Sequence, residues 1–324
     1  MNTSETQGKR RTEEEDEDIE HWNRHLISVA KLGYIEQIKW AISEGANINV
    51  DNGRALIESA KNGHLEAVKY LHEQGVNVRA QNDAALLYSA SNGHLPVVKY
   101  LCEHEADINN GRVLIDSAKN GHIDVVKYLH GQGANIHAGD DWALIESARN
   151  GHLSTVQYLH EQGANIHAQN NEALLDSAHG GHLETVKYLH KHGADIHTQD
   201  ERALIYSSSR GHLPIVKYLV EAGSNPKAIA KLETPLRHCA INDNIEMAEY
   251  LVEVCGCKPE VITEHDSAEK NIKDWATKYI NARDMSNKLT NELSEKPSFK
   301  DIVKGLGQQA AQQQGLTQSG KRKM

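Results

Sequence analysis

Histidine is the residue type in this chain that offers the most chemistry, because 20 of the 324 residues are histidines. An imidazole ring can ligate a metal ion or exchange a proton near neutral pH. Many of the histidines recur at near-regular intervals and form three rows. The first row is His64, His94, His122, His152, His182 and His212, the second is His72, His130, His160 and His190, and the third is His137, His167 and His197.

The spacing of these rows argues against a shared metal ion. Ligating atoms lie about 2.1 Å from zinc and therefore within ~4 Å of each other. Packed helices stand about 8–10 Å apart, so histidines on successive helices cannot bind one ion. Cys255 and Cys257, with Cys239 and His265 nearby, form an equally weak motif, because C-x-C is not the usual zinc spacing. We predict no metal and no cofactor, and we expect the first row to form hydrogen bonds.

No motif of a catalytic site is present in the sequence. It lacks the nucleophile elbow, the P-loop, the dinucleotide fingerprint, the H-E-x-x-H zinc motif and the kinase signatures. Asp and Glu are numerous, and we expect them on exposed faces with ordinary pKa values. The sequence therefore predicts that the protein is not an enzyme.

The histidines also predict a response to pH. Protonation of all 20 would change the formal charge from −10 to +10. We therefore expect the fold to loosen, or its choice of partner to change, at endosomal pH.

The histidine rows are part of an internal repeat that organises most of the chain. Residues 143–172 read ALIESARNGHLSTVQYLHEQGANIHAQNNE, and residues 55–84 read ALIESAKNGHLEAVKYLHEQGVNVRAQNDA. Related units begin at residues 25, 55, 85, 113, 143, 173, 203 and 235. Self-similarity at such a period is typical of proteins built from stacked repeats.

Each unit has the pattern of two short helices. In residues 143–172 apolar and small residues mark one face of a first helix, which ends near Gly151. Leu153, Val156 and Leu159 mark a second helix, which ends at Gly163 and leads into an extended loop. Helices of this length do not persist alone, so stacking must stabilise them.

The unit resembles the ankyrin repeat in its Gly-His turn, its V-x-Y-L run and its G-A-[N/D]-I segment. Seven of the eight units carry the turn glycine, and six carry Gly-His. The resemblance implies an all-α solenoid of about eight helix-turn-helix repeats, and we expect a helical cap at its C-terminal end. Most units have 30 residues and open with A-L, whereas the family pattern has 33 and opens with T-P-L-H, matched here only by Thr234, Pro235 and Leu236. We expect the missing residues to shorten the β-turn fingers, as in the arrays of amoebal giant viruses and amoeba-associated intracellular bacteria that this form resembles.

Four regions follow from composition and pattern. We expect a disordered acidic arm at residues 1–20, the ankyrin-repeat domain at 21–262, a helical C-terminal cap or extension at 263–307, and a disordered Gln-rich tail with a basic end at 308–324. The cap is predicted from apolar residues at helical spacing, among them Ile272, Trp275 and Leu289. A partner-binding or membrane-surface helix is the alternative for this segment.

Charge and hydropathy limit the classes of partner that we expect for this chain. A formal charge of −10 and a pI near 6.0 argue against nucleic acid. No apolar run is long enough to span a membrane, and we do not expect a secretion signal at the N-terminus. Four cysteines do not make a disulfide framework, which favours a reducing compartment. We expect a monomer in the cytoplasm of the producing cell or of a host cell, with the nucleus as an alternative.

The positions that change between repeats predict the partner surface. Three variable columns lie at offsets of zero, four and seven residues in the first helices, which places them on one stripe. Aromatic residues in this stripe are typical anchors of protein interfaces. The predicted partner-binding residues are Arg54, Glu58, Tyr88, Arg112, Asp116, Trp142, Glu146, Arg149, Glu172, Asp176, Arg202 and Tyr206. They favour a non-catalytic scaffold that captures another protein on its concave face. The alternative is a host-directed adaptor or effector, whose repeats select a target while its C-terminal region recruits other machinery.

Overall fold

The computed structural model describes the backbone of residues 13–294 and the side chains of residues 17–290. These residues form 19 helices and no strand. The chain divides between Ala228 and Ile229 into two compact units. Unit 1 holds the first seven repeats, and unit 2 holds the eighth repeat with the C-terminal helices.

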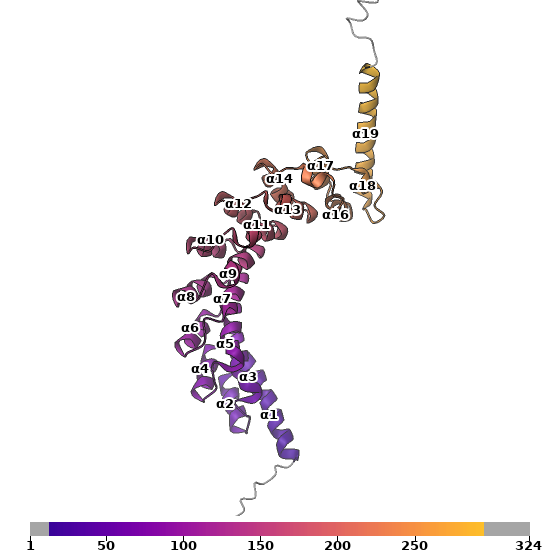
Figure 1. Cartoon of the computed structure of the whole chain (residues 1–324). Coiled ribbons are helices and arrows are strands. Elements are labelled where there is room, and N and C mark those ends of the chain that lie inside the picture. The colour runs from indigo at the N-terminus through magenta and orange to yellow at the C-terminus, as the bar shows by residue number, and fades with distance from the viewer. Residues whose placement is uncertain (1–12, 295–324) are drawn as a thin grey trace, which may run out of the picture. The chain divides into compact units, whose positions relative to one another are not determined.

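Unit 1 is a stack of seven helical hairpins, as the repeat pattern predicts. The first helices are α1 (Glu13–Leu32), α3 (Val50–Lys61), α5 (Ala80–Ser91), α7 (Gly111–Lys119), α9 (Ala138–Arg149), α11 (Ala168–Gly180) and α13 (Thr198–Ser209). The second helices are α2 (Ile35–Ser43), α4 (Leu65–Glu73), α6 (Leu95–Glu103), α8 (Ile123–Gly131), α10 (Leu153–Glu161), α12 (Leu183–Lys191) and α14 (Leu213–Glu221). Each first helix packs on the next first helix, and the stack curves with the first helices on its inner side (Figure 1).

The core of the stack is made of small and medium apolar residues that recur in every repeat. In repeat 5 Leu144, Ala148, Val156 and Leu159 are fully buried. The buried serine of the first helix is satisfied within its own helix, because Oγ of Ser147 donates to the carbonyl of Leu144. Repetition of this pattern buries one continuous core between neighbouring hairpins.

The loop between hairpins differs from the extended loop that the sequence predicts. Gln169, Asn170 and Asn171 all have left-handed backbone angles, and the equivalent residues of four other repeats do so as well. Asn, Asp and Gly adopt this conformation most readily, and they supply most of these positions. The next repeat caps such a turn, since Nε2 of Gln81 donates to the carbonyl of Asp51 at 2.7 Å.

The acidic run at the N-terminus also departs from expectation. Residues 1–20 were expected to be disordered, but α1 begins at Glu13 and takes in the whole run from Glu13 to Asp18. Acidic side chains stabilise the first turns of a helix, because the N-terminal end carries partial positive charge. Residues 1–12 lie outside the described residues.

Unit 2 contains a last hairpin and two further helices. The hairpin is α16 (Thr234–Asn242) with α17 (Ile245–Glu253), and α18 (Glu260–Thr263) precedes the long α19 (Lys270–Ser294). Helix α16 packs on α17, α18 and α19, and the first turns of α19 bury Ile272 and Ala276. Leu289 on the same helix is exposed, so only part of the predicted apolar stripe packs. The short helix α15 (Lys227–Ala230) lies in the connection before α16. The helix expected near Phe299 and the tail at 308–324 lie outside the described residues.

Candidate partner-binding face of the first helices

The variable columns of α3, α5, α7, α9, α11 and α13 form the candidate site, which we call the first-helix face. Each column position repeats on a neighbouring helix of the stack, so the stripes lie side by side. Cross-helix contacts show this directly, because Arg149 on α9 reaches Asp176 on α11 at 2.7 Å. The first-helix face therefore places residues of different repeats in contact.

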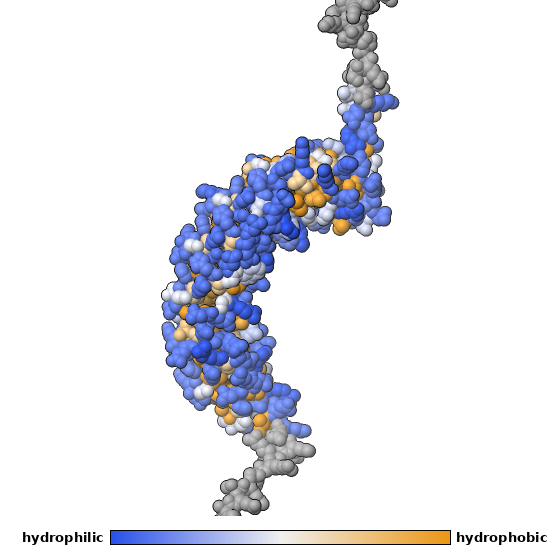
Figure 2. Space-filling view, in the orientation of Figure 1, coloured by the Kyte–Doolittle hydropathy of each residue, from blue (hydrophilic) through white to orange (hydrophobic). Residues whose placement is uncertain are grey.

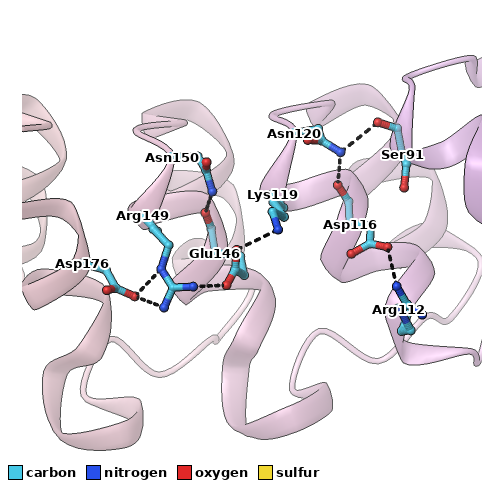
Figure 3. A network of polar contacts seen from close by, with 9 residues as sticks. All are labelled: Ser91, Arg112, Asp116, Lys119, Asn120, Glu146, Arg149, Asn150 and Asp176. Carbon is cyan, nitrogen blue, oxygen red and sulfur yellow. Dashed lines mark hydrogen bonds and ion pairs between the residues drawn. The ribbon is translucent and has the colours of Figure 1, made fainter. Parts of the chain in front are cut away.

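A chain of ion pairs runs across the middle of the first-helix face (Figure 3). Nζ of Lys119 lies 3.8 Å from Oε2 of Glu146, whose Oε1 accepts a bond of 2.6 Å from Arg149. Arg149 also donates to Oδ2 of Asp176 through Nε and Nη2. The chain alternates positive and negative charges from α7 through α9 to α11. Such a network fixes the side chains of the face before any partner arrives.

Two asparagines beside this chain hold the ends of the first helices (Figure 3). Nδ2 of Asn150 donates to the carbonyl of Glu146, and Asn120 donates to the carbonyls of Asp116 and Ser91. Asn120 therefore links α7 to the end of α5. These residues lie outside the predicted columns, but their recurrence before the turn glycine was visible in the sequence.

The carboxylates of the face are more buried than the sequence suggests. We expected them to be exposed, but Glu58 and Glu146 are buried, and the side chain of Asp176 is only 13% exposed. Their position at the centre of the stripe, beneath longer basic side chains, excludes water from them. Burial, followed by the charge of Asp176, raises the pKa of the Glu172 carboxyl.

Each aromatic residue of the face lies against a cation. Nζ of Lys61 lies 5.6 Å from the ring centre of Tyr88, and Arg149 lies 5.7 Å from that of Trp142. Arg202 lies 5.2 Å from the ring centre of Tyr206 and donates to its hydroxyl at 2.7 Å. Tyr88 is 40% exposed, whereas Trp142 and Tyr206 are half-buried, so Tyr88 presents the most open ring of the three.

The remaining predicted residues form local pairs. Arg54 contacts Glu58 at 2.6 Å, and Arg112 contacts Asp116 at 3.7 Å. Among the residues that the structure describes, no ion pair links Arg54 with Glu58, or Arg112 with Asp116, to the ion-pair chain of α7, α9 and α11. Lys61 and Lys119 were in the variable columns but not among the predicted binding residues. Their contacts with Tyr88 and Glu146 place them in the site.

The histidines of the first row form hydrogen bonds between repeats, as predicted. Nε2 of His64 lies 3.0 Å from the carbonyl oxygen of Lys31, and His94 and His182 make the same contact with Lys61 and Arg149. The second row bonds forward, since Nδ1 of His130 lies 2.8 Å from the hydroxyl of Tyr158. Within residues 13–294, no group of three or more His, Cys, Asp or Glu residues is arranged to hold a metal ion.

Comparison with known proteins identifies the family. A family model for ankyrin repeats matches residues 26–112, 114–200 and 174–263. The chain belongs to the ankyrin-repeat family. Its structure is similar to the crystal structure of the human ASB11 ankyrin repeat domain, with 21% identity, 56% of this chain and 96% of that chain covered, and a TM-score of 0.49. A search of curated proteins gives no match.

Ankyrin repeats generally mediate interactions between proteins, and the family is typically non-catalytic. In the part of this chain that the structure describes, no helix is both long and apolar enough to cross a bilayer.

Proposed function

We propose that this ankyrin-repeat protein is a non-catalytic scaffold whose first-helix face, on the concave side of unit 1, binds another protein. The observation that carries the proposal is the pairing of Tyr88, Trp142 and Tyr206 with Lys61, Arg149 and Arg202 on one face. The framework of the repeats stays constant while these positions vary, which is the arrangement expected of a selective surface.

Pre-organisation supports this proposal. A free side chain loses rotamer freedom when a partner immobilises it, at a cost of about 0.5–1.5 kcal/mol. Arg149 is already held by Glu146, Asp176 and the ring of Trp142, so little of this cost falls on binding. Trp, Tyr and Arg are also the residues most enriched at interface hot spots.

The exposed fractions of the charged side chains indicate which groups a partner would contact first. The side chains of Lys119 and Arg149 are 51% and 41% exposed, whereas that of Glu146 beneath them is 6% exposed. Basic groups and aromatic rings therefore supply most of the contact surface along this stretch. The recessed carboxylates hold the basic groups in position.

The test is affinity capture with the wild-type chain beside a Tyr88→Ala, Trp142→Ala, Tyr206→Ala variant. The control is a Tyr34→Ala, Trp40→Ala variant, because both residues are exposed aromatics in α2 or at its start, away from the face. We expect the triple variant to lose its specific partners and the control to keep them. With an isolated partner, the loss should be at least about 100-fold in Kd, since hot-spot residues cost 2 kcal/mol or more each. A prey set that is identical for all three proteins would mean that another surface binds.

One observation favours the adaptor alternative as a second candidate. The described residues from Ile229 to Ser294 form their own compact unit, which would carry a separate partner. Truncation tests this second candidate. A chain that ends at residue 228 lacks the whole of unit 2, whereas a chain that ends at residue 262 would keep α16 without the helix α19 that packs on it. If the shortened chain binds its target and produces the full biological effect, the adaptor function is wrong.

A further inference from the structure

Two adjoining hollows lie on the surface of unit 2. The first has a volume of about 260 Å³ and lies between residues 230–233, Leu236 and the segment that leads into α18. The second, of about 500 Å³, runs along Glu260 and Glu264 to Arg283 on α19. Both are lined by Glu233, Lys258 and Val261, so they form one continuous depression, which we call the α16–α18 groove.

The floor of the first hollow is apolar. Leu236 is buried, and Leu232 and Val261 are half-buried with part of their surface open. The space-filling view shows apolar surface over the region of α16 and α18, whereas hydrophilic surface prevails over the visible side of unit 1 (Figure 2). The first hollow is large enough for one or two apolar side chains but small for a drug-sized ligand.

The charges around the groove differ in how they are paired. Glu233 is held by Arg237 at 2.6 Å, and Glu260 is held by Arg283 at 2.8 Å. Lys231 and Lys258 are exposed, line the first hollow, and form no ion pair among the described residues. Glu264 is exposed at the other end of the groove. The apolar floor is thus flanked by the exposed Lys231 in the first hollow and by Glu264 at the far end, with the exposed Lys258 between them where the two hollows meet.

We propose that the α16–α18 groove binds an extended peptide segment of a partner protein that carries acidic residues next to an apolar residue. The apolar side chain would lie on Leu232 and Val261, and its neighbouring carboxylates would contact Lys231 and Lys258. A partner that covered these lysines without supplying anions would leave desolvated, unpaired charges, which costs several-fold in affinity at least. Glu264 repels acids at the far end and therefore sets the direction of the segment.

This site is independent of the first-helix face. It uses only residues of unit 2, and it would give the protein a second partner whether or not the first-helix face binds one.

The experiment uses the full-length chain and a fluorescein-labelled GEELLG peptide, with binding measured by fluorescence anisotropy. Two control peptides replace the glutamates by lysine or the leucines by serine. We expect the acidic, apolar peptide to bind and both controls to bind at least tenfold more weakly. Equal binding of the three peptides, or no binding of the first, would overturn the proposal.

Variants locate the site. A Lys231→Glu, Lys258→Glu double variant should weaken binding at least tenfold. A Lys270→Glu, Lys278→Glu variant makes the same charge change on exposed lysines of α19 outside the groove and should bind as the wild type does.

A Leu232→Ser, Val261→Ser variant tests the apolar floor of the groove and should also weaken binding, with its melting temperature recorded to confirm folding. If both groove variants bind like the wild type, the peptide lies elsewhere. The Tyr88, Trp142, Tyr206 variant should keep peptide binding, which separates this test from that of the first-helix face.

Discussion

The imidazole ring of His94 occupies the space in which a side chain on Gly63 would lie. A Cβ atom built on Gly63 would be 2.6 Å from Nδ1 of His94, while Nε2 of the same ring lies 3.0 Å from the carbonyl oxygen of Lys61. The turn glycine of one repeat and the turn histidine of the next therefore form a single contact. Gly63 also has a φ of +80°, which L-residues rarely adopt.

Substitution of Gly63 by alanine should destabilise the protein by more than the backbone effect alone. Gly75 in the same repeat is the matched control, because its φ is +95° and a Cβ there meets nothing within 4 Å. We expect Gly75→Ala to cost about 1–2 kcal/mol, the penalty for the left-handed conformation, and Gly63→Ala about 2 kcal/mol more. Urea denaturation measures both. Equal losses would show that the His94 ring moves aside freely.

The bond between His130 and Tyr158 permits a second matched comparison. Nδ1 of His130 lies 2.8 Å from the Tyr158 hydroxyl, and Lys127 lies over the same ring. Tyr128 has the same lysine contact, from Lys99, but Cys102 stands where the histidine would be. Tyr158→Phe should therefore lower the free energy of unfolding by about 0.5–1.5 kcal/mol, and Tyr128→Phe by less. A larger loss for Tyr128→Phe would contradict the role assigned to the histidine.

The sequence predicts the repeats and their helices well because their evidence is local and recurs many times. Leu144 and its equivalents show the core position, and Gly151 shows where a helix ends. The cross-repeat partner of each turn histidine could be anticipated only as a hydrogen bond of some kind, because the acceptor is a backbone carbonyl 31 or 33 residues earlier in the chain.

The left-handed turns and the burial of the carboxylates on the first-helix face were harder to predict from the sequence. Gln169 and Gln199 both have a positive φ, although glutamine is not a residue type that favours this conformation. Glu146 looks like a solvent-exposed residue until Arg149 and Lys119 are placed over it. The partner surface itself stays a prediction, because exposure and variability show where contact is allowed and not what makes it.

Loss of Arg149 should destabilise unit 1, because two buried or nearly buried carboxylates depend on it. Arg149→Leu leaves Glu146 and Asp176 without their guanidinium, and we expect a cost of about 1–3 kcal/mol, reduced from that of a fully buried pair by the exposure of the arginine. Arg112→Leu is the control. Its side chain is 73% exposed and 3.7 Å from Asp116, so its loss should cost under about 0.5 kcal/mol. Thermal unfolding of both variants at low and high salt would check this. If the two variants are equally stable, the ion-pair chain does not contribute to the stability of unit 1.

The histidines should make the stack less stable as the pH falls below neutrality. Burial is the main cause that lowers the pKa values of His72, His94, His152 and His160, and the charges of His104 and His192 add to this at His72 and His160. The folded state therefore binds fewer protons than the unfolded chain below pH ~6.5, the ordinary histidine pKa, so stability is lost as the pH drops through that value. His197 acts in the opposite sense, because its bond to Glu201 raises its pKa.

Melting temperatures at pH 7.5, 6.5 and 5.5 would measure this effect. We expect a steady decrease from pH 7.5 to 5.5 in the wild type. A His72→Gln, His160→Gln variant should show a smaller decrease, because the amides can still bond to the Tyr100 and Tyr188 hydroxyls but cannot be protonated in this range. His197→Gln should show a larger decrease, since it removes a histidine whose pKa is raised in the folded state. If the melting temperature falls by the same amount in all three proteins between pH 7.5 and 5.5, these half-buried histidines do not control the stability of the stack.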